Sequence, residues 1–306
     1  MRLAFAILGR FAEAVLSLLV LACFTFFLLH LLPGSPFDQE THLNPEVRRT
    51  LMTQWGLMET PVHQLFTYFG NLLQGDLGIS LVQDRPVLQM LWQGGAATFK
   101  ISFYAVMMVF SLGFGIALMM QSRWKKLGIL FDQLTVLMIS LPSLFLGPLL
   151  IWIFAIRFDW LPVGLLNSPL SYLLPVLTLS LRPAAHVARI LSQSLQGTLQ
   201  LDYMRMAKAK GLSATQILVH HALKNSLLPL LGASAPLIMG LLSGSFLVEI
   251  LFAIPGLGSL FVEALASRDV TLILGMTLFE GALLIFLSML SDVATTVIDP
   301  RLRGRE

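Results

Sequence analysis

Charged side chains are scarce in this 306-residue chain, and cysteine is almost absent. Asp, Glu, Lys and Arg make up 12% of the residues, about half of the roughly 25% that is usual in soluble proteins. This shortage excludes an ordinary soluble enzyme and a disordered tail. Cys23 is the single cysteine, so no disulfide can form within the chain and a disulfide scaffold is excluded. A hydrophobic share of 56% predicts a multi-span membrane protein, and a net charge of +3 is too small to indicate nucleic-acid binding.

Motifs for nucleotide hydrolysis and for membrane-embedded catalysis are also absent. No Gly-x-x-x-x-Gly-Lys-Ser/Thr loop occurs, so this chain lacks the segment that cradles ATP phosphates. If the protein uses energy from ATP, that energy must come from another subunit. There is no His-Glu-x-x-His zinc motif, and Ser243-Gly244 lacks the first glycine of a membrane serine-nucleophile motif. We interpret Ser243 and Gly244 as small residues at a helix contact. We therefore expect no catalytic residue, no metal ligand and no bound cofactor in this chain.

Long apolar stretches are present instead. Each can cross a hydrocarbon core about 30 Å thick, which requires about 20 mostly apolar residues in a helix. The stretches are too continuous for the alternating pattern of barrel strands. The sequence therefore predicts an all-α integral membrane protein with six transmembrane helices. The predicted spans are residues 11–32, 97–120, 132–156, 170–191, 227–252 and 271–298.

Lys and Arg are distributed unequally over the segments between these spans. With a cytoplasmic N-terminus, thirteen of them lie on the cytoplasmic side and five outside. Because positive residues concentrate in cytoplasmic loops, both termini are predicted to be cytoplasmic. Residues 33–96 then form the long outer segment. Asn44-Pro45 and Thr60-Pro61 are typical helix starts in this segment.

The cytoplasmic segment 192–226 carries the most informative pattern. A helix over residues 202–210 places Tyr203, Ala207 and Gly211 on one face, because they are spaced by four. Because Ala207 has only a methyl group and Gly211 no side-chain carbon, no large side chain would protrude from this face at these positions. Another protein could therefore approach it closely. Gly211 is also a typical helix stop.

A second helix is predicted to start directly after this stop. Ser213-x-x-Gln216 fits a capping box, so residues 202–216 form an elbow between two helices. The elbow is flanked by the basic residues Arg205, Lys208 and Lys210. One interpretation is a basic amphipathic segment lying on anionic lipid. Met204, Met206 and Leu212 do not build a continuous apolar stripe facing the lipid, which favours the alternative that the elbow docks onto a cytoplasmic partner.

Several segments resemble the permease subunits of ABC importers for oligopeptides and dipeptides. The segment 203–212, Tyr-Met-Arg-Met-Ala-Lys-Ala-Lys-Gly-Leu, resembles that family's EAA loop. Residues 32–36 and 75–78, Leu-Pro-Gly-Ser-Pro and Gly-Asp-Leu-Gly, resemble the B-type subunit of the oligopeptide importers. The likeness extends in order over nearly the whole chain. Its other segments are residues 221–229, 249–258 and 292–301.

The resemblance implies a type I ABC importer fold in a bacterial inner membrane, importing short peptides. A second, homologous permease would share the translocation path, and an extracytoplasmic solute-binding protein would deliver the substrate. Cytoplasmic ABC ATPase subunits would bind ATP and Mg²⁺. The domains implied are a first transmembrane helix over 1–32, an outer segment with short helices over 33–96, and a five-helix core over 97–306 with its coupling loop at about 192–226.

Individual roles follow from the matching positions. The residues expected to couple the chain to the ATPase are Tyr203, Arg205, Ala207, Lys208 and Gly211. The residues expected to act in structure or gating are Glu249, Pro255, Gly256, Gly258 and Asp292. Arg205 stands where the EAA loop has its glutamate, as is usual in peptide permeases. Ser192, Gly197 and Ser288 also depart from the family pattern and bear on the choice of ATPase partner.

Glu280 lies inside the last predicted span, where an ionisable side chain costs about 2.5–3.5 kcal/mol. One interpretation is that it lines the translocation path and meets cationic groups of the cargo. The alternative is a buried partner for Lys100, for Arg182 or for a residue of the second permease. Lys100 and Arg182 lie toward the ends of their spans, where long side chains can reach the interface.

Other functions remain open on the sequence. The same fold could import glutathione, a nickel chelate or an antimicrobial peptide. An ion-coupled transporter acting alone would use Glu280 as its proton site, and a membrane-embedded enzyme is disfavoured by the missing motifs.

Overall fold

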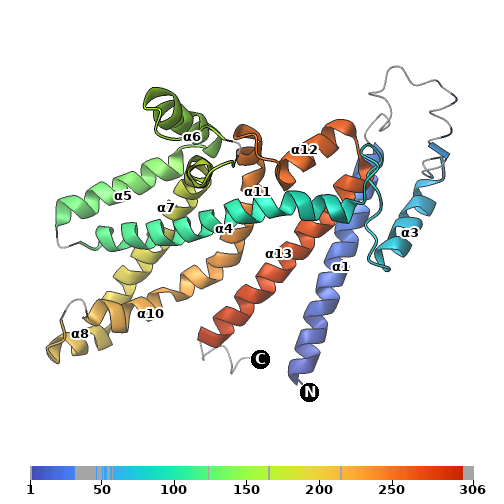
Figure 1. Ribbon diagram of the computed structural model, residues 1–306. Coiled ribbons are helices and arrows are strands. Elements are labelled where there is room, and N and C mark those ends of the chain that lie inside the picture. The colour runs from blue at the N-terminus through green and yellow to red at the C-terminus, as the bar shows by residue number, and fades with distance from the viewer. Residues whose placement is uncertain are drawn as a thin grey trace. The chain divides into compact units, whose positions relative to one another are not determined.

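The computed structural model describes residues 2–31, 58–122, 124–164, 166–213 and 216–298, with isolated positions between 46 and 56. Within these ranges the chain is helical apart from turns, loops and one isolated β-bridge between Ile79 and Pro86 (Figure 1). The predicted all-α class is confirmed. The chain forms two compact units, Met1–Ala97 with Pro255–Phe286, and Thr98–Ile254 with Leu287–Glu306.

The first unit is held together by contacts of its long helices. It contains α1 (Arg2–Leu31), α3 (Pro61–Leu72), the start of α4 (Val87–Met120), α12 (Leu257–Ser267) and most of α13 (Val270–Ile298). His30 at the end of α1 bonds through Nε2 with Oε1 of Gln64 in α3, at 3.2 Å. Gly281 of α13 lies so close to α1 that an added Cβ would be 2.7 Å from Leu21. Small residues at such positions let two apolar helices approach closely.

Helix α3 begins where the sequence predicts. Pro61 is its first residue, and Thr60 before it has an extended backbone, with φ −65° and ψ 143°. Proline fits the first helical position because its missing N–H would have no partner there. The predicted start at Asn44-Pro45 and the segment 32–36 lie outside the described residues.

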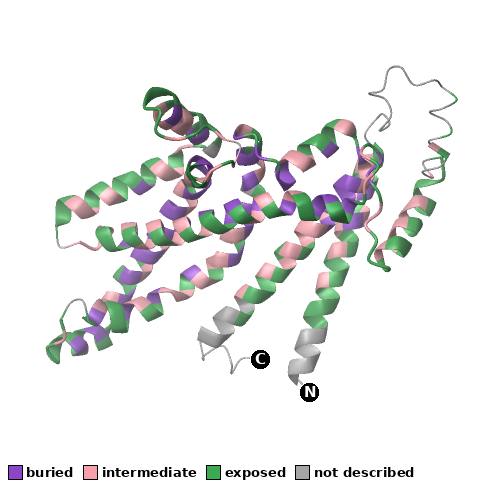
Figure 2. Cartoon of the chain, in the orientation of Figure 1, coloured by how far each residue is buried: buried purple, intermediate pink, exposed green. Residues whose placement is uncertain are grey.

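The second unit is built around α7 (Leu173–Leu199), which packs against α5, α6, α10 and α11. Figure 2 shows buried residues along α7, and Gly113 of α4 lies so close to it that an added Cβ would be 2.5 Å from Val187. Polar side chains on α7 are tolerated because its neighbours cover much of it. This unit also contains α4 from Thr98 onward and the end of α13 from Leu287 onward. Its other elements are α5 (Lys125–Ser140), α6 (Ser143–Leu150), η2 (Ile151–Arg157), η3 (Pro169–Tyr172), α8 (Asp202–Ala209), η4 (Ile217–Ala222), α10 (Leu223–Ser226) and α11 (Leu228–Leu251).

The predicted number of six spans is not confirmed. Four helical stretches of the described chain are long and apolar enough to cross a membrane, namely Gly9–Leu31, Val87–Met120, Leu228–Leu251 and Val270–Ser291. The predicted span 170–191 is helical from Leu173 onward as part of α7. Because α7 contains Arg182 and Arg189, it is not among the helices that are apolar enough to be counted as membrane spans.

The predicted span 132–156 is a bent pair of helices rather than one rod. The segments Lys125–Ser140 and Leu144–Arg157 meet at an angle of 109°. Leu141 between them is extended, with φ −80° and ψ 124°, because Pro142 disfavours the helical conformation of the residue before it. If this pair counts as one span, the described chain has five.

Candidate functional site

The elbow is anchored by an apolar inner side. Met204 of α8 is fully buried and Ala207 is 7% exposed. Both belong to a cluster that joins the end of α4, the end of α7 and the segment after the corner. The cluster consists of Ala117, Ala188, Leu191, Leu195, Met204, Ala207, Ile217 and Ala222. Because these side chains come from helices on both sides of the corner, the cluster fixes the elbow to the ends of the long helices.

The corner itself is a Schellman motif centred on Gly211. The amide of Leu212 donates to the carbonyl of Ala207 at 3.4 Å, and the amide of Gly211 donates to the carbonyl of Lys208 at 3.0 Å. Gly211 has φ +79°, in the left-handed region that glycine adopts without steric cost. The predicted helix stop is confirmed. An added Cβ at Gly211 would meet nothing within 4 Å, so this surface is open.

The second helix of the elbow starts with the predicted capping box. The backbone amide of Ser213 donates to Oε1 of Gln216 at 2.9 Å, and the amide of Gln216 donates to Oγ of Ser213 at 3.3 Å. Two amides at the helix start are thereby satisfied reciprocally. Together with the Schellman motif, the capping box fixes the backbone on both sides of the corner.

The outer side of the elbow carries polar and basic groups. Tyr203 is 38% exposed, and its hydroxyl accepts a hydrogen bond from Nδ2 of Asn225 at 2.7 Å. Arg205 pairs with Asp202 at 3.6 Å, with side chains 79% and 96% exposed. Such an exposed pair contributes little to stability, so the guanidinium can exchange this partner for another. Lys208 is also exposed.

The structure corrects the predicted position of Ala207. This residue was expected to leave a low face open to a partner, but its methyl group is turned inward against the cluster. A spacing of four residues places Tyr203, Ala207 and Gly211 on one side of an ideal helix. The spacing does not show which part of that side is covered by the rest of the chain. The open surface is formed by Tyr203, Arg205, Lys208 and Gly211.

We therefore expect Ala207→Leu to destabilise the elbow. The added methylene and methyl groups would overpack the cluster, which typically costs about 1–3 kcal/mol. Ala209→Leu is the matched control, because Ala209 is exposed on the same helix. Thermal unfolding of the two purified variants measures the difference. Equal melting temperatures would contradict the inward position of Ala207.

The second predicted group, around Pro255, Gly256 and Gly258, lies in the first unit. The amide of Gly256 donates to Oγ of Ser259 at 3.0 Å at the start of α12. An added Cβ at Gly94 of α4 would lie 3.3 Å from the backbone of Gly256. A small cavity of about 310 Å³ lies here. Its lining includes Pro255 and Gly256, together with Gln83, Arg85 and Glu263.

Glu249 is fully buried in α11 of the second unit. Its Oε1 accepts hydrogen bonds from the hydroxyls of Thr98 at 2.7 Å and Ser245 at 3.0 Å. Its backbone carbonyl accepts from the amide of Ile254 at 2.8 Å, beyond the end of the helix. This is the environment of a structural anchor, since burying a carboxylate requires such partners.

Asp269 is a structural residue that the sequence interpretation missed. It is 1% exposed, and its carboxylate accepts a hydrogen bond from the Ser80 hydroxyl and bonds from the backbone amides of Leu81 and Val82. It also caps α13 by accepting from the amide of Leu272 at 3.1 Å. An acidic residue directly before a long apolar run is an N-cap signal, and this signal could have identified it.

Comparison with known protein families identifies the family of this chain. Residues 110–304 match the family model described as binding-protein-dependent transport system inner membrane component. The chain belongs to this family. It is a multi-pass membrane component of a transport system that depends on a binding protein, and the family is a transport component rather than a catalytic one.

Two relatives of this permease align over nearly its full length. The oligopeptide transport system permease protein OppB of Haemophilus influenzae is 36% identical over 304 residues, covering 97% of this chain and 98% of that protein. The dipeptide transport system permease protein DppB of Bacillus subtilis is 35% identical over 298 residues, covering 96% of each.

Two solved structures share its fold. An amino acid ABC transporter has a TM-score of 0.56 and 18% identity, covering 68% of this chain and 94% of that one. The MetNI methionine ABC transporter in an inward-facing form has a TM-score of 0.60 and 16% identity, covering 69% and 97%. The predicted type I ABC importer permease fold is confirmed.

The remaining predicted residues of this permease are placed as follows. Glu280 is half-buried on α13, and the side chain of Asp292 lies outside the described residues. Ser192, which departs from the family pattern, is buried in α7 and accepts a hydrogen bond from Nε2 of Gln121 at 2.9 Å. Among the described residues, no group of three or more His, Cys, Asp or Glu is placed to hold a metal ion.

Proposed function

We propose that this permease is one half of the membrane path of an ATP-driven importer of short peptides. The observation that carries the proposal is the near full-length likeness to permeases named for oligopeptide and dipeptide transport, at 36% and 35% identity. A likeness over the whole chain favours a shared cargo class more strongly than a shared fold does, because the path-forming helices are included in it.

The elbow supports coupling to a separate motor. Its backbone is fixed at Gly211 and Ser213, its inner side is packed, and its outer side offers Tyr203, Arg205 and Lys208. A rigid knob of this kind can transmit movement of a cytoplasmic ABC ATPase to α7 and the helices after the corner. Ala207 would contribute by packing rather than by touching the ATPase.

The complete importer would contain further subunits. A second, homologous permease would close the path, ATPase subunits would bind ATP and Mg²⁺, and an extracytoplasmic solute-binding protein would deliver the peptide. Both termini and the elbow would be cytoplasmic, residues 33–96 would lie outside, and residues 97–306 would form the core. Glu280 would face the path, while Glu249, Pro255, Gly256, Gly258 and Asp292 would act in structure or gating.

Uptake by the reconstituted importer tests the proposal. The complex, in proteoliposomes with ATP inside and the binding protein outside, is expected to import a labelled tripeptide and to stop when either ATP or the binding protein is left out. Glutathione and a nickel chelate are supplied in parallel. Import of these alone would contradict the peptide cargo, and import driven by a proton gradient without ATP would indicate an ion-coupled transporter using Glu280.

A further inference from the structure

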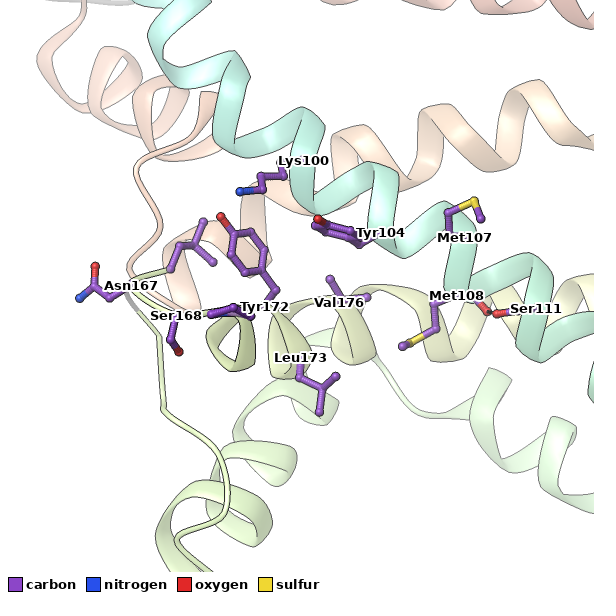
Figure 3. A pocket seen from close by; sticks show the side chains of 12 residues that line it. Lys100, Tyr104, Met107, Met108, Ser111, Asn167, Ser168, Tyr172, Leu173 and Val176 are labelled. Atoms are coloured by element: carbon purple, nitrogen blue, oxygen red, sulfur yellow. Dashed lines mark hydrogen bonds between the residues drawn. The ribbon is translucent and has the colours of Figure 1, made fainter.

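A cavity of about 740 Å³ lies in the second unit, away from the elbow. It is formed by α4, by the loop and turn before α7, and by the first turns of α7, with Lys100, Tyr172 and Tyr104 near one another (Figure 3). Its volume falls within the usual range of small-molecule sites, about 300–1,000 Å³. None of the roles described above uses this cavity.

One end of the cavity carries an exposed cation. Nζ of Lys100 lies over the ring of Tyr172, 4.8 Å from its centroid, and Tyr104 packs edge-on against the same ring at 5.8 Å. In the described part of this unit, no Asp or Glu forms an ion pair with Lys100. An aromatic face attracts the ammonium group, and a hydrogen bond to Tyr172 uses one of its three donors. This arrangement leaves room for an anion.

The rest of the lining is mixed and adaptable. Lys100 and Ser111 are eleven residues apart on α4, about 16 Å along a helix that rises 1.5 Å per residue. The apolar part is formed by Met107, Met108, Leu166, Pro169, Leu173 and Val176. Methionine side chains are flexible and polarizable and suit sites that accept ligands of different shapes. An apolar side chain of variable shape could therefore lie here.

Polar side chains line the cavity near Lys100 and again at Ser111, which favours a peptide over an acyl chain. The lining residues with a polar side chain are Lys100, Tyr104, Ser111, Asn167, Ser168 and Tyr172. An acyl chain would gain nothing from the amide and hydroxyl groups, whereas a peptide presents backbone amides to them. An anionic lipid headgroup would also suit Lys100, and uptake measured with and without anionic lipid distinguishes it from a peptide carboxylate.

We propose that this cavity receives the C-terminal end of a peptide in transit, with the terminal carboxylate on Lys100 and the last side chain against Met107 and Met108. This inference rests on the proposed function of the chain as a peptide permease. It assigns to Lys100 a role in cargo recognition, in place of the interfacial position that the sequence alone suggests.

The test compares one tripeptide with a free C-terminal carboxylate and the same tripeptide as its amide. Uptake by the reconstituted importer is measured for the wild type, Lys100→Gln and Lys100→Arg, with Lys126→Gln as the matched exposed-lysine control. For Lys100→Gln we expect the KM of the free peptide to rise about tenfold or more, as for one lost charge-assisted hydrogen bond, while the KM of the amide changes little. Lys100→Arg retains most of the preference. The same binding protein is used throughout, so its own selectivity cancels between variants.

Other outcomes overturn the inference. If Lys100→Gln lowers the uptake of both peptides equally, Lys100 has a structural or lipid-binding role. Liposomes without anionic lipid separate these two roles. If Lys100 binds a lipid headgroup, removing the anionic lipid should lower uptake by the wild type but not by Lys100→Gln. Unchanged kinetics in Lys100→Gln would exclude any role in recognition. No uptake of either peptide by the wild type would overturn the proposed function as well.

A second measurement does not depend on the amide being delivered. A photo-crosslinking amino acid at position 107 is expected to label the C-terminal residue of a transported peptide during ATP turnover. Labelling of lipid alone, or of no peptide, would contradict the proposal.

Discussion

Gly211→Trp is expected to abolish transport while leaving the permease folded in the membrane. Gly211 has φ +79° and open space around it, so the indole would project outward from the corner, where the ATPase is proposed to bind. A bulky group there would prevent the elbow from seating. Uptake by the reconstituted importer should fall to background, and the ATPase should lose its stimulation by the loaded binding protein.

Two further substitutions separate bulk from backbone strain. These are Gly211→Ala and Gly211→Asn. Asparagine adopts the left-handed conformation more readily than alanine does, but its side chain is larger. If docking requires a low surface, the loss of uptake should increase from Ala to Asn to Trp. If strain at the corner dominates, Gly211→Asn should retain the most activity. Normal uptake by Gly211→Trp would contradict the coupling role of the elbow.

Asp269→Ala is expected to destabilise the first unit strongly. The substitution leaves the buried donors of Ser80, Leu81 and Leu272 and the partly buried amide of Val82 without their acceptor. Each unsatisfied donor costs about 1–3 kcal/mol, partly offset by relaxation and by water. We expect the free energy of unfolding to fall by about 3 kcal/mol or more, measured as a lower melting temperature and less monodisperse protein in detergent.

The matched control for this prediction is Glu263→Ala. Glu263 is exposed on α12, and its carboxylate accepts a hydrogen bond from Nε2 of Gln83 at 3.1 Å. Its removal should change stability by about 0.5 kcal/mol or less. Asp269→Asn should fall between the two, because the amide retains one acceptor oxygen and places a donor against the remaining donors. Equal stability of Asp269→Ala and Glu263→Ala would contradict the anchoring role of Asp269.

Local signals in the sequence were reliable guides to local structure. The glycine stop at Gly211, the capping box of Ser213 and Gln216, and the start of α3 at Pro61 each depend on backbone chemistry within a few residues. The scarcity of charge and the long apolar runs determined the all-α membrane class, because only helices and closed barrels satisfy their backbone groups in lipid.

What depends on packing between distant residues was decided by the tertiary structure. The direction of Ala207, the 109° bend at Leu141-Pro142 and the burial of α7 depend on neighbours that no short window contains. The same holds for Asp269, whose partners Ser80, Leu81 and Val82 lie nearly 190 residues away in the chain. The cavity at Lys100 likewise requires α4 and the start of α7 side by side. The class of the protein and the corners of its chain are predictable without the fold, since they follow from composition and local hydrogen bonds. Only the folded chain decided which side chains face outward, because burial is a property of the whole arrangement.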